Sequence, residues 1–185
     1  MRNYLSGRMR RLAYVLALGS AIFPQQSNSD ISRLEKNVEE GIEMIARADS
    51  LSGTWGAEPD TIQASILYSS AASILDPGVY GTSDLLEAVP DTLQIWRPYI
   101  VLDKLAAYAN QGLAFLSPKG MRERLFQKSR ELYEGALELD KDDEFALRNL
   151  ACVLEELGDP MAGIVRFHYR EVLERKGAKM PLKKS

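Results

Sequence analysis

The chain has 185 residues, of which 45% are hydrophobic and 26% charged, and its net charge is −3. This length allows one domain with an ordinary core, and the charge balance favours neither nucleic acid nor wholesale membrane binding. The single cysteine, Cys152, excludes an internal disulfide framework and a multi-cysteine zinc site. Strand signals are sparse, so the composition predicts an all-α fold.

Residues 1–21 are predicted to be a signal peptide or an N-terminal anchor. Four arginines precede an apolar run from Leu12 to Phe23, and the first acidic residue is Asp30. A basic start followed by a short apolar run is typical of secretory signals, and the small residues before Ala21 suit cleavage after it. The run is shorter than the roughly 20 residues that span a bilayer. We therefore expect export to a periplasmic or other extracytoplasmic, membrane-associated compartment.

Other interpretations of this segment remain open. Acid-free leaders that carry arginine and serine also direct proteins to mitochondria. Arg10 and Arg11 before an apolar run weakly resemble a twin-arginine signal. If the segment is not cleaved, it remains as an anchor. The lone cysteine suits an oxidising compartment, because no second thiol is present to mispair with it.

A polar linker is predicted for residues 22–30, followed by a helical domain over residues 31–176. In the first helix, from Ile31 to near Leu51, apolar residues recur at steps of three and four and so share one face. Asp60 is the predicted N-cap of a second helix that ends near Leu75.

A long connector follows, over residues 79–97, with one short helix predicted at residues 84–89. A connector of this length inside a compact domain is unusual and is often functional. Pro98 suits the first turn of a third helix that continues to about Leu116.

Three more helices complete the domain, giving about six main helices. The fourth is predicted from Met121 to Leu139 and the fifth from Glu144 to Leu157, with a solvated acidic junction between them and Gly158 as the C-terminal cap of the fifth. The sixth runs from Pro160 to Lys176. The remaining tail, residues 177–185, is basic and predicted to be disordered.

Two triplets of residues share a register thirty-four positions apart: Ser129, Tyr133 and Ala136, then Gly163, Phe167 and Arg170. The helix between them carries four apolar residues at steps of three, one and three: Leu147, Leu150, Ala151 and Leu154. A fixed period of this size is typical of stacked helix–turn–helix units. Each such unit buries its apolar face by stacking on its neighbours.

With these residues, roughly positions 60–175 resemble the tetratricopeptide repeat (TPR) family. In that family the second helix of a unit carries a small residue, an aromatic residue four positions later, an alanine three after that and a proline five further. The chain departs from this pattern at Ser69, where an aromatic is expected, at Lys141, where a proline is expected, and at Arg170, where an alanine is expected. The resemblance implies a short helical-hairpin solenoid, whereas a plain helical bundle is the alternative.

The resemblance also implies a groove for a protein partner, either a peptide or a subunit. The inner helix of the last unit would present five residues to it: Phe145, Arg148, Asn149, Cys152 and Glu156. Lys104 and Asn110 on the third helix would extend this set. Some family members clamp a terminal carboxylate, but several cations are needed to hold one firmly. Here Glu155 and Glu156 oppose an anionic ligand.

Aromatic residues at or beside loops are a second candidate interface: Trp55, Tyr80, Trp96 and Tyr99. Aromatic side chains are enriched at binding hot spots, although they also pin loops onto a core. A basic stripe from Arg166 to Lys184 could meet an anionic membrane surface or an acidic partner. The alternative is that these charges favour the helix dipole and solubility.

The sequence predicts no catalysis, no cofactor and no metal. Any Cys–His nucleophilic pair would need both Cys152 and His168, and a phosphate loop, HExxH and GxSxG are all missing. We expect a non-catalytic scaffold, adaptor or assembly factor that binds protein and no nucleic acid. With barely three units, self-association is also open. The alternative is a structural accessory subunit of a membrane-bound complex, retained by an uncleaved N-terminal helix.

Overall fold

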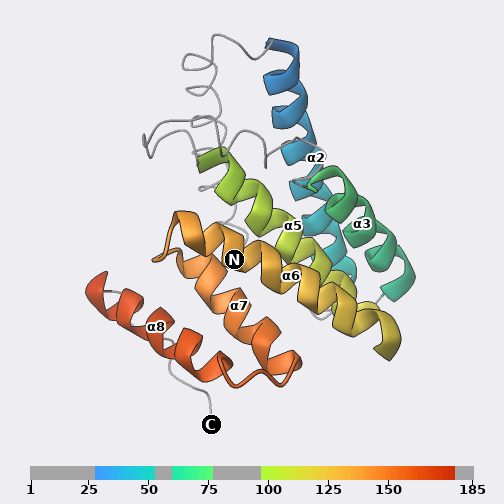
Figure 1. Cartoon of the computed structure of the whole chain (residues 1–185). Helices are drawn as coiled ribbons and strands as arrows, with labels where there is room; N and C mark the ends of the chain where they lie inside the picture. Colours follow the sequence, from blue (N-terminus) through green and yellow to red (C-terminus); the bar gives the residue numbers. More distant parts are fainter. Residues whose placement is uncertain (1–27, 53–59, 77–96, 178–185) are drawn as a thin grey trace.

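The computed structural model describes residues 28–52, 60–76 and 97–177. These ranges contain helices and no strand, so the expected all-α fold is confirmed (Figure 1). The helices are α2 (Asn28–Leu51), α3 (Thr61–Ile74), α5 (Arg97–Leu116), α6 (Lys119–Leu139), α7 (Glu144–Glu156) and α8 (Ala162–Arg175). The predicted leader, the short helix at 84–89 and the tail beyond Gly177 lie outside the described residues.

The helix ends follow local chemistry closely. The carboxylate of Asp60 accepts a hydrogen bond from the amide of Gln63 at 3.0 Å and caps α3, as predicted. The first helix begins at Asn28 rather than Ile31, so the end of the predicted linker is helical. In α6 the helix begins two residues before the predicted Met121.

Two further caps fix α7. Asp143 accepts from the amide of Ala146 at 2.8 Å, an N-cap inside the junction that we expected only to be solvated. At the other end Gly158 has φ +68°, a left-handed conformation in which glycine carries no side-chain penalty. The amide of Gly158 donates a hydrogen bond to the carbonyl of Glu155, and the amide of Asp159 donates to the carbonyl of Leu154 at 2.8 Å. Together these bonds satisfy two carbonyls in the last turn of the helix.

Each described helix packs against the next along the chain, and α5 also touches α2 and α7. Figure 1 shows this order as a progression from α2 and α3 on one side to α8 on the other. The core has two parts, one among α2, α3 and α5 and the other among α5 to α8. Leu132 of α6 packs against both parts. The helix pair α5–α6 is therefore the centre of the molecule.

Two buried hydrogen bonds fix the alignment of α6 against α5. The hydroxyl of Ser129 donates to the carbonyl of Ala107 at 2.8 Å, and that of Tyr133 donates to Gln111 Oε1 at 3.0 Å. Both donors are fully buried. Because an unsatisfied buried hydroxyl is costly, these bonds favour one alignment of the two helices.

The same register has a different environment on α8. Ser129, Tyr133 and Ala136 are inaccessible on α6, whereas Phe167 is 62% exposed on α8. A Cβ added at Gly163 would meet nothing within 4 Å. The repeated pattern therefore predicts the helix correctly, but this face is buried in α6 and open in α8.

Candidate partner-binding surfaces

One side of α7 carries all five residues that the sequence assigned to the groove of the last unit. They recur at steps of three, one, three and four, away from the buried Leu147 and Leu154, so they share one helix face. Arg148 is exposed, and Phe145 and Cys152 are half-buried. Glu156 is exposed at the end of the helix, and the Asn149 amide donates to the carbonyl of Phe145 at 2.8 Å.

The face continues onto α5 through two contacts. The ring of Tyr108 lies 5.7 Å from that of Phe145, measured between centroids. The side chain of Gln111 lies close to the thiol of Cys152. Burial and then nearby Glu156 and Glu155 raise the pKa of this thiol, and they outweigh Gln111, which lowers it. Because the thiolate is the reactive form, this thiol is expected to react slowly at neutral pH.

Asp49 brings α2 into the same surface. Its carboxylate accepts hydrogen bonds from the hydroxyl of Tyr68 at 2.5 Å and from that of Tyr108 at 3.4 Å. Burial raises the pKa of Asp49, and the two tyrosine hydrogen bonds partly offset this. Burial and then the Asp49 charge raise the pKa of Tyr108 to about 12, while the positive charge of Arg148 lowers it. Arg148 therefore lies within electrostatic reach of Tyr108.

We call this surface the α2–α5–α7 face, and we define it by Asp49, Tyr108, Phe145, Arg148 and Cys152. Sequence reasoning missed Asp49, Tyr68, Tyr108 and Gln111. The Asp49–Tyr108 contact joins residues that are fifty-nine positions apart in the sequence, and no local sequence pattern predicts such a pair. Aromatic residues and arginine together are typical of binding hot spots.

Two residues of the predicted groove need correction. The amide of Asn110 is buried, with 4% of the residue exposed, and donates to the carbonyl of Ala106 at 2.8 Å. Asn110 therefore cannot line a binding surface in this conformation. The ammonium of Lys104 lies 2.5 Å from Asp143 Oδ2, and both side chains are largely buried. Lys104 thus ties the N-terminus of α7 to α5 and is not free to hold a ligand.

The remaining candidate residues lie elsewhere. Trp55, Tyr80 and Trp96 fall outside the described residues, and Tyr99 belongs to α5 in a part whose side chains are not described. His168 does not share the contacts of Cys152, because its Nε2 lies 3.3 Å from Asp142 Oδ1.

The basic stripe is partly used to hold α8 in place. The guanidinium of Arg175 binds both oxygens of Asp142 at 2.9 and 3.0 Å, and Lys176 lies 3.1 Å from Glu144. Arg166 pairs with Glu155. These charges therefore join α8 to the junction before α7 and to α7 itself, although exposed pairs of this kind contribute little stability individually.

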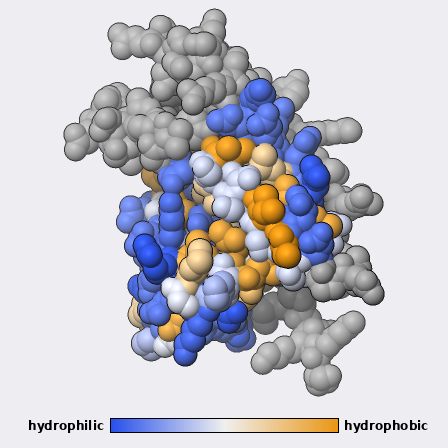
Figure 2. All heavy atoms as spheres, turned by 90° about the vertical axis from the view of Figure 1, so that its right-hand side faces the viewer, coloured by the Kyte–Doolittle hydropathy of each residue, from blue (hydrophilic) through white to orange (hydrophobic). Residues whose placement is uncertain are grey.

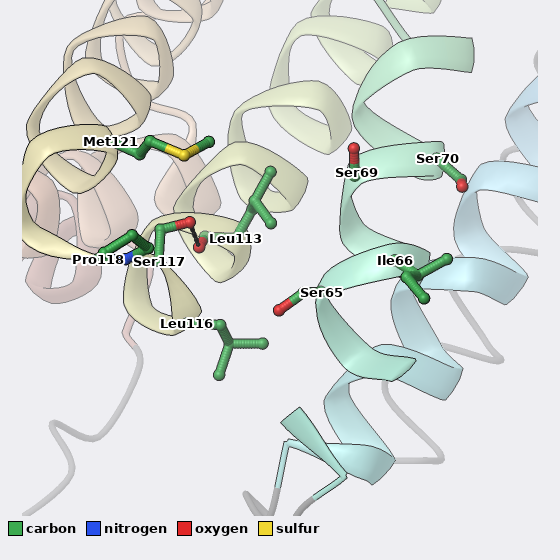
Figure 3. Close-up of a pocket in the computed structure, with 9 residues that line it drawn as sticks. All are labelled: Ser65, Ile66, Ser69, Ser70, Leu113, Leu116, Ser117, Pro118 and Met121. Carbon is green, nitrogen blue, oxygen red and sulfur yellow. Dashed lines mark hydrogen bonds between the residues drawn. The ribbon is translucent and has the colours of Figure 1, made fainter. Parts of the chain in front are cut away.

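A second surface lies on another side of the molecule. Figure 2 shows hydrophobic residues gathered in the middle of this side, between hydrophilic margins. A groove of about 440 Å³ runs there between α3 and the start of α6, with the end of α5 as its floor (Figure 3). Its lining consists of Ser65, Ile66, Ser69, Ser70, Leu113, Leu116, Ser117, Pro118 and Met121. We call it the serine groove.

Asp103, on α5, is expected to make stability depend on pH. Burial raises the pKa of its carboxyl from 3.8 to about 6, so the folded protein keeps a proton that the unfolded chain releases. This contribution to stability is present below about pH 4 and is lost as the pH rises to about 6. Asp103→Asn should therefore raise the free energy of unfolding at pH 7 and change it little below pH 4. Urea unfolding at the two pH values checks this, and an equal effect at both would contradict it.

Within the described ranges, no helix combines the length and apolar character needed to cross a membrane. The same residues contain no group of three or more His, Cys, Asp or Glu side chains placed to hold a metal ion.

Comparisons with known proteins give no match to a family model, a curated protein or a solved structure. The functional argument therefore depends on the residues and geometry of the two surfaces.

Proposed function

We propose that this protein is a non-catalytic scaffold, adaptor or assembly factor that binds a partner protein through the α2–α5–α7 face. The observation that carries the proposal is the continuous set of contacts from Asp49 through Tyr108 to Phe145. These contacts join three helices that are distant in sequence into one surface. The resemblance to TPR units supports it, because their inner helices present residues to bound peptides.

The chemistry of the face suggests what a partner must offer. Tyr108 and Phe145 present half-buried rings, and burying such rings further is favourable. Arg148 is exposed and has no ion-pair partner among the described residues. The Asp49 carboxylate already accepts from two tyrosine hydroxyls and is not an open acceptor. A fitting partner segment therefore offers an apolar side chain for the rings and a carboxylate or carbonyl for Arg148.

We also propose that the protein works outside the cytoplasm, with its N-terminal segment acting as an export signal. Four arginines followed by an apolar run support this proposal. The mass of the mature N-terminus distinguishes cleavage after Ala21 from retention. Retention in a membrane fraction would favour the alternative role, an accessory subunit of a membrane-bound complex.

Replacing Arg148 tests the binding function. We expect Arg148→Ala to weaken capture of the partner by about 2 kcal/mol, or roughly thirtyfold in Kd, which is the scale of an arginine hot spot. The measurement is native purification through a C-terminal tag, with quantitative mass spectrometry of stoichiometric partners and titration of the main one.

Arg170→Ala is the matched control, because Arg170 is an exposed arginine on α8. It should leave both capture and affinity unchanged. Undiminished binding by Arg148→Ala, or an equal loss in the control, would contradict the placement of the site. Circular dichroism of both variants checks that the fold is kept.

A further inference from the structure

The serine groove has an apolar lining that the fold leaves open. Leu113 and Leu116 form its floor, and 54% of Met121 on its α6 wall is exposed. In Figure 3 the side chains of Ser65 and Met121 extend from opposite helices toward the space between them. A shallow apolar groove of this kind can receive a side chain or a short segment.

The α3 wall is unusual for a helix at a protein surface. No charged residue occurs between Thr61 and Ile74, although Ile62 and Ile66 on this helix are 76% and 53% exposed. Surface helices normally carry charged or polar residues opposite their buried side. Here the outer side offers only isoleucines and small hydroxyl residues, so a partner can approach the backbone closely without displacing charges.

Two serine hydroxyls of the groove already donate hydrogen bonds within the protein. The hydroxyl of Ser65 donates to the carbonyl of Thr61 at 2.7 Å, and that of Ser117 donates to the carbonyl of Leu113 at 2.7 Å. Because these hydroxyls are already satisfied within their own helices, an apolar group can cover them without leaving a donor unpaired. The groove therefore favours an apolar side chain over a polar one.

One end of the groove is positively charged. Nη2 of Arg122 donates to the carbonyl of Ser117, a lining residue, at 3.2 Å, so the guanidinium lies at the groove's edge. Arg122 and Lys119 are exposed and have no acidic partner within the part of the chain that the structure describes. Pro118 is the N-cap of α6 and makes no side-chain hydrogen bond to it, and this helix end carries partial positive charge.

At the other end of the groove, an ion pair between α6 and the residues after α3 neutralises the charges. Two turns beyond Met121 on α6, the ammonium of Lys128 lies 2.7 Å from Asp76, which follows α3. This ion pair spans the two walls of the groove. The positive end is therefore the one with unpaired charge, and it sets the direction in which a charged ligand would lie.

We propose that the serine groove is a second docking site, which binds an acidic amphipathic peptide segment of a partner protein. An apolar side chain of the segment lies between Ser69 and Leu113, and a neighbouring carboxylate meets Arg122 and the start of α6. The site is separate from the α2–α5–α7 face and independent of its function.

The probe is a fluorescein-labelled amphipathic peptide of Leu, Ala and Glu, titrated with the full-length chain by fluorescence polarisation. We expect saturable binding that weakens as salt is added, because exposed charges are screened. A twin peptide with Lys in place of every Glu should bind at least about tenfold more weakly, as expected when a charge-assisted contact is lost.

Two variants should weaken binding of the Glu peptide by about tenfold or more. Arg122→Glu reverses the charge at the edge, and Ser69→Trp fills the groove without changing charge. Ser69 is exposed, so the tryptophan need not disturb the core. The matched controls are Arg170→Glu on α8 and Ser73→Trp, one turn along α3 and outside the lining, and both should bind as the wild type does.

Three results would overturn the proposal. The first is equal binding of the Lys peptide, and the second is an equal loss in the control variants. The third is a failure to bind the Glu peptide while vesicles of anionic phosphatidylserine are bound and released by Arg122→Glu, which would assign the surface to a membrane. Arg148→Ala should leave peptide binding unchanged, so this test and that of the α2–α5–α7 face can fail separately.

Discussion

Tyr133→Ala is expected to lower the free energy of unfolding by about 3–5 kcal/mol, the largest effect of any single change proposed for this protein. The Tyr133 ring is fully buried in α6 and packs near the ring of Phe145. Removing it leaves a cavity in the core cluster among α5 to α8. It also leaves the Oε1 atom of Gln111 without its hydroxyl donor, which adds to the cost.

The matched change, Phe167→Ala, should cost less than about 1 kcal/mol. Phe167 has the same place in α8 that Tyr133 has in α6, but 62% of it is exposed. Urea unfolding followed by circular dichroism measures both variants, and the slope with denaturant shows whether unfolding stays two-state. Equal losses would mean that the face of α8 is covered in solution, for example by self-association.

The second large effect concerns a close contact at Gly112. A Cβ at this position would lie 2.5 Å from two ring atoms of Tyr68. The ring cannot simply turn away, because its hydroxyl is bonded to Asp49. Gly112→Ala should therefore destabilise the protein by about 1–3 kcal/mol, although glycine to alanine within a helix normally stabilises by about 1 kcal/mol.

Gly163→Ala is the control for this prediction. Gly163 lies in a helix, and an added Cβ there meets nothing within 4 Å. It should show the ordinary gain in helix propensity of up to about 1 kcal/mol. Thermal unfolding of the two variants should thus shift in opposite directions. A rise in Tm for both would show that Tyr68 can move at little cost and that its bond to Asp49 does not fix the ring.

Local patterns in the sequence were sufficient to predict the helices and most of their ends. The N-cap at Asp60 depends on neighbours a few residues away and was predicted correctly. The glycine predicted to cap the end of α7, Gly158, directly follows its C-cap, Leu157. The position of Asn110 could also have been read correctly. It follows Ala106 by four residues and Leu102 by eight, so it belongs to the same buried stripe.

The residues that form the binding surface were harder to predict from the sequence, because they depend on which helices pack together. No local pattern indicates that Lys104 is paired, because its carboxylate partner, Asp143, lies thirty-nine positions later. Likewise the register of Phe167 predicts a helix but not its burial, which depends on the element packed against it. The serine groove does have a signal in the sequence, the charge-free segment from Thr61 to Ile74, but the repeat pattern does not depend on charge.

The single cysteine allows the most direct test of the binding face. Cys152 is half-buried on the α2–α5–α7 face and no other residue of the chain is a thiol, so alkylation reports this position alone.

The rate of alkylation should be measured by mass spectrometry in the free protein and in its complex with the co-purified partner. Cys152→Ser with Ser73→Cys moves the thiol to the exposed side of α3 as a control. Binding through the proposed face predicts strong protection of Cys152 and an unchanged rate at position 73. An unchanged rate at Cys152 in a saturated complex would contradict it.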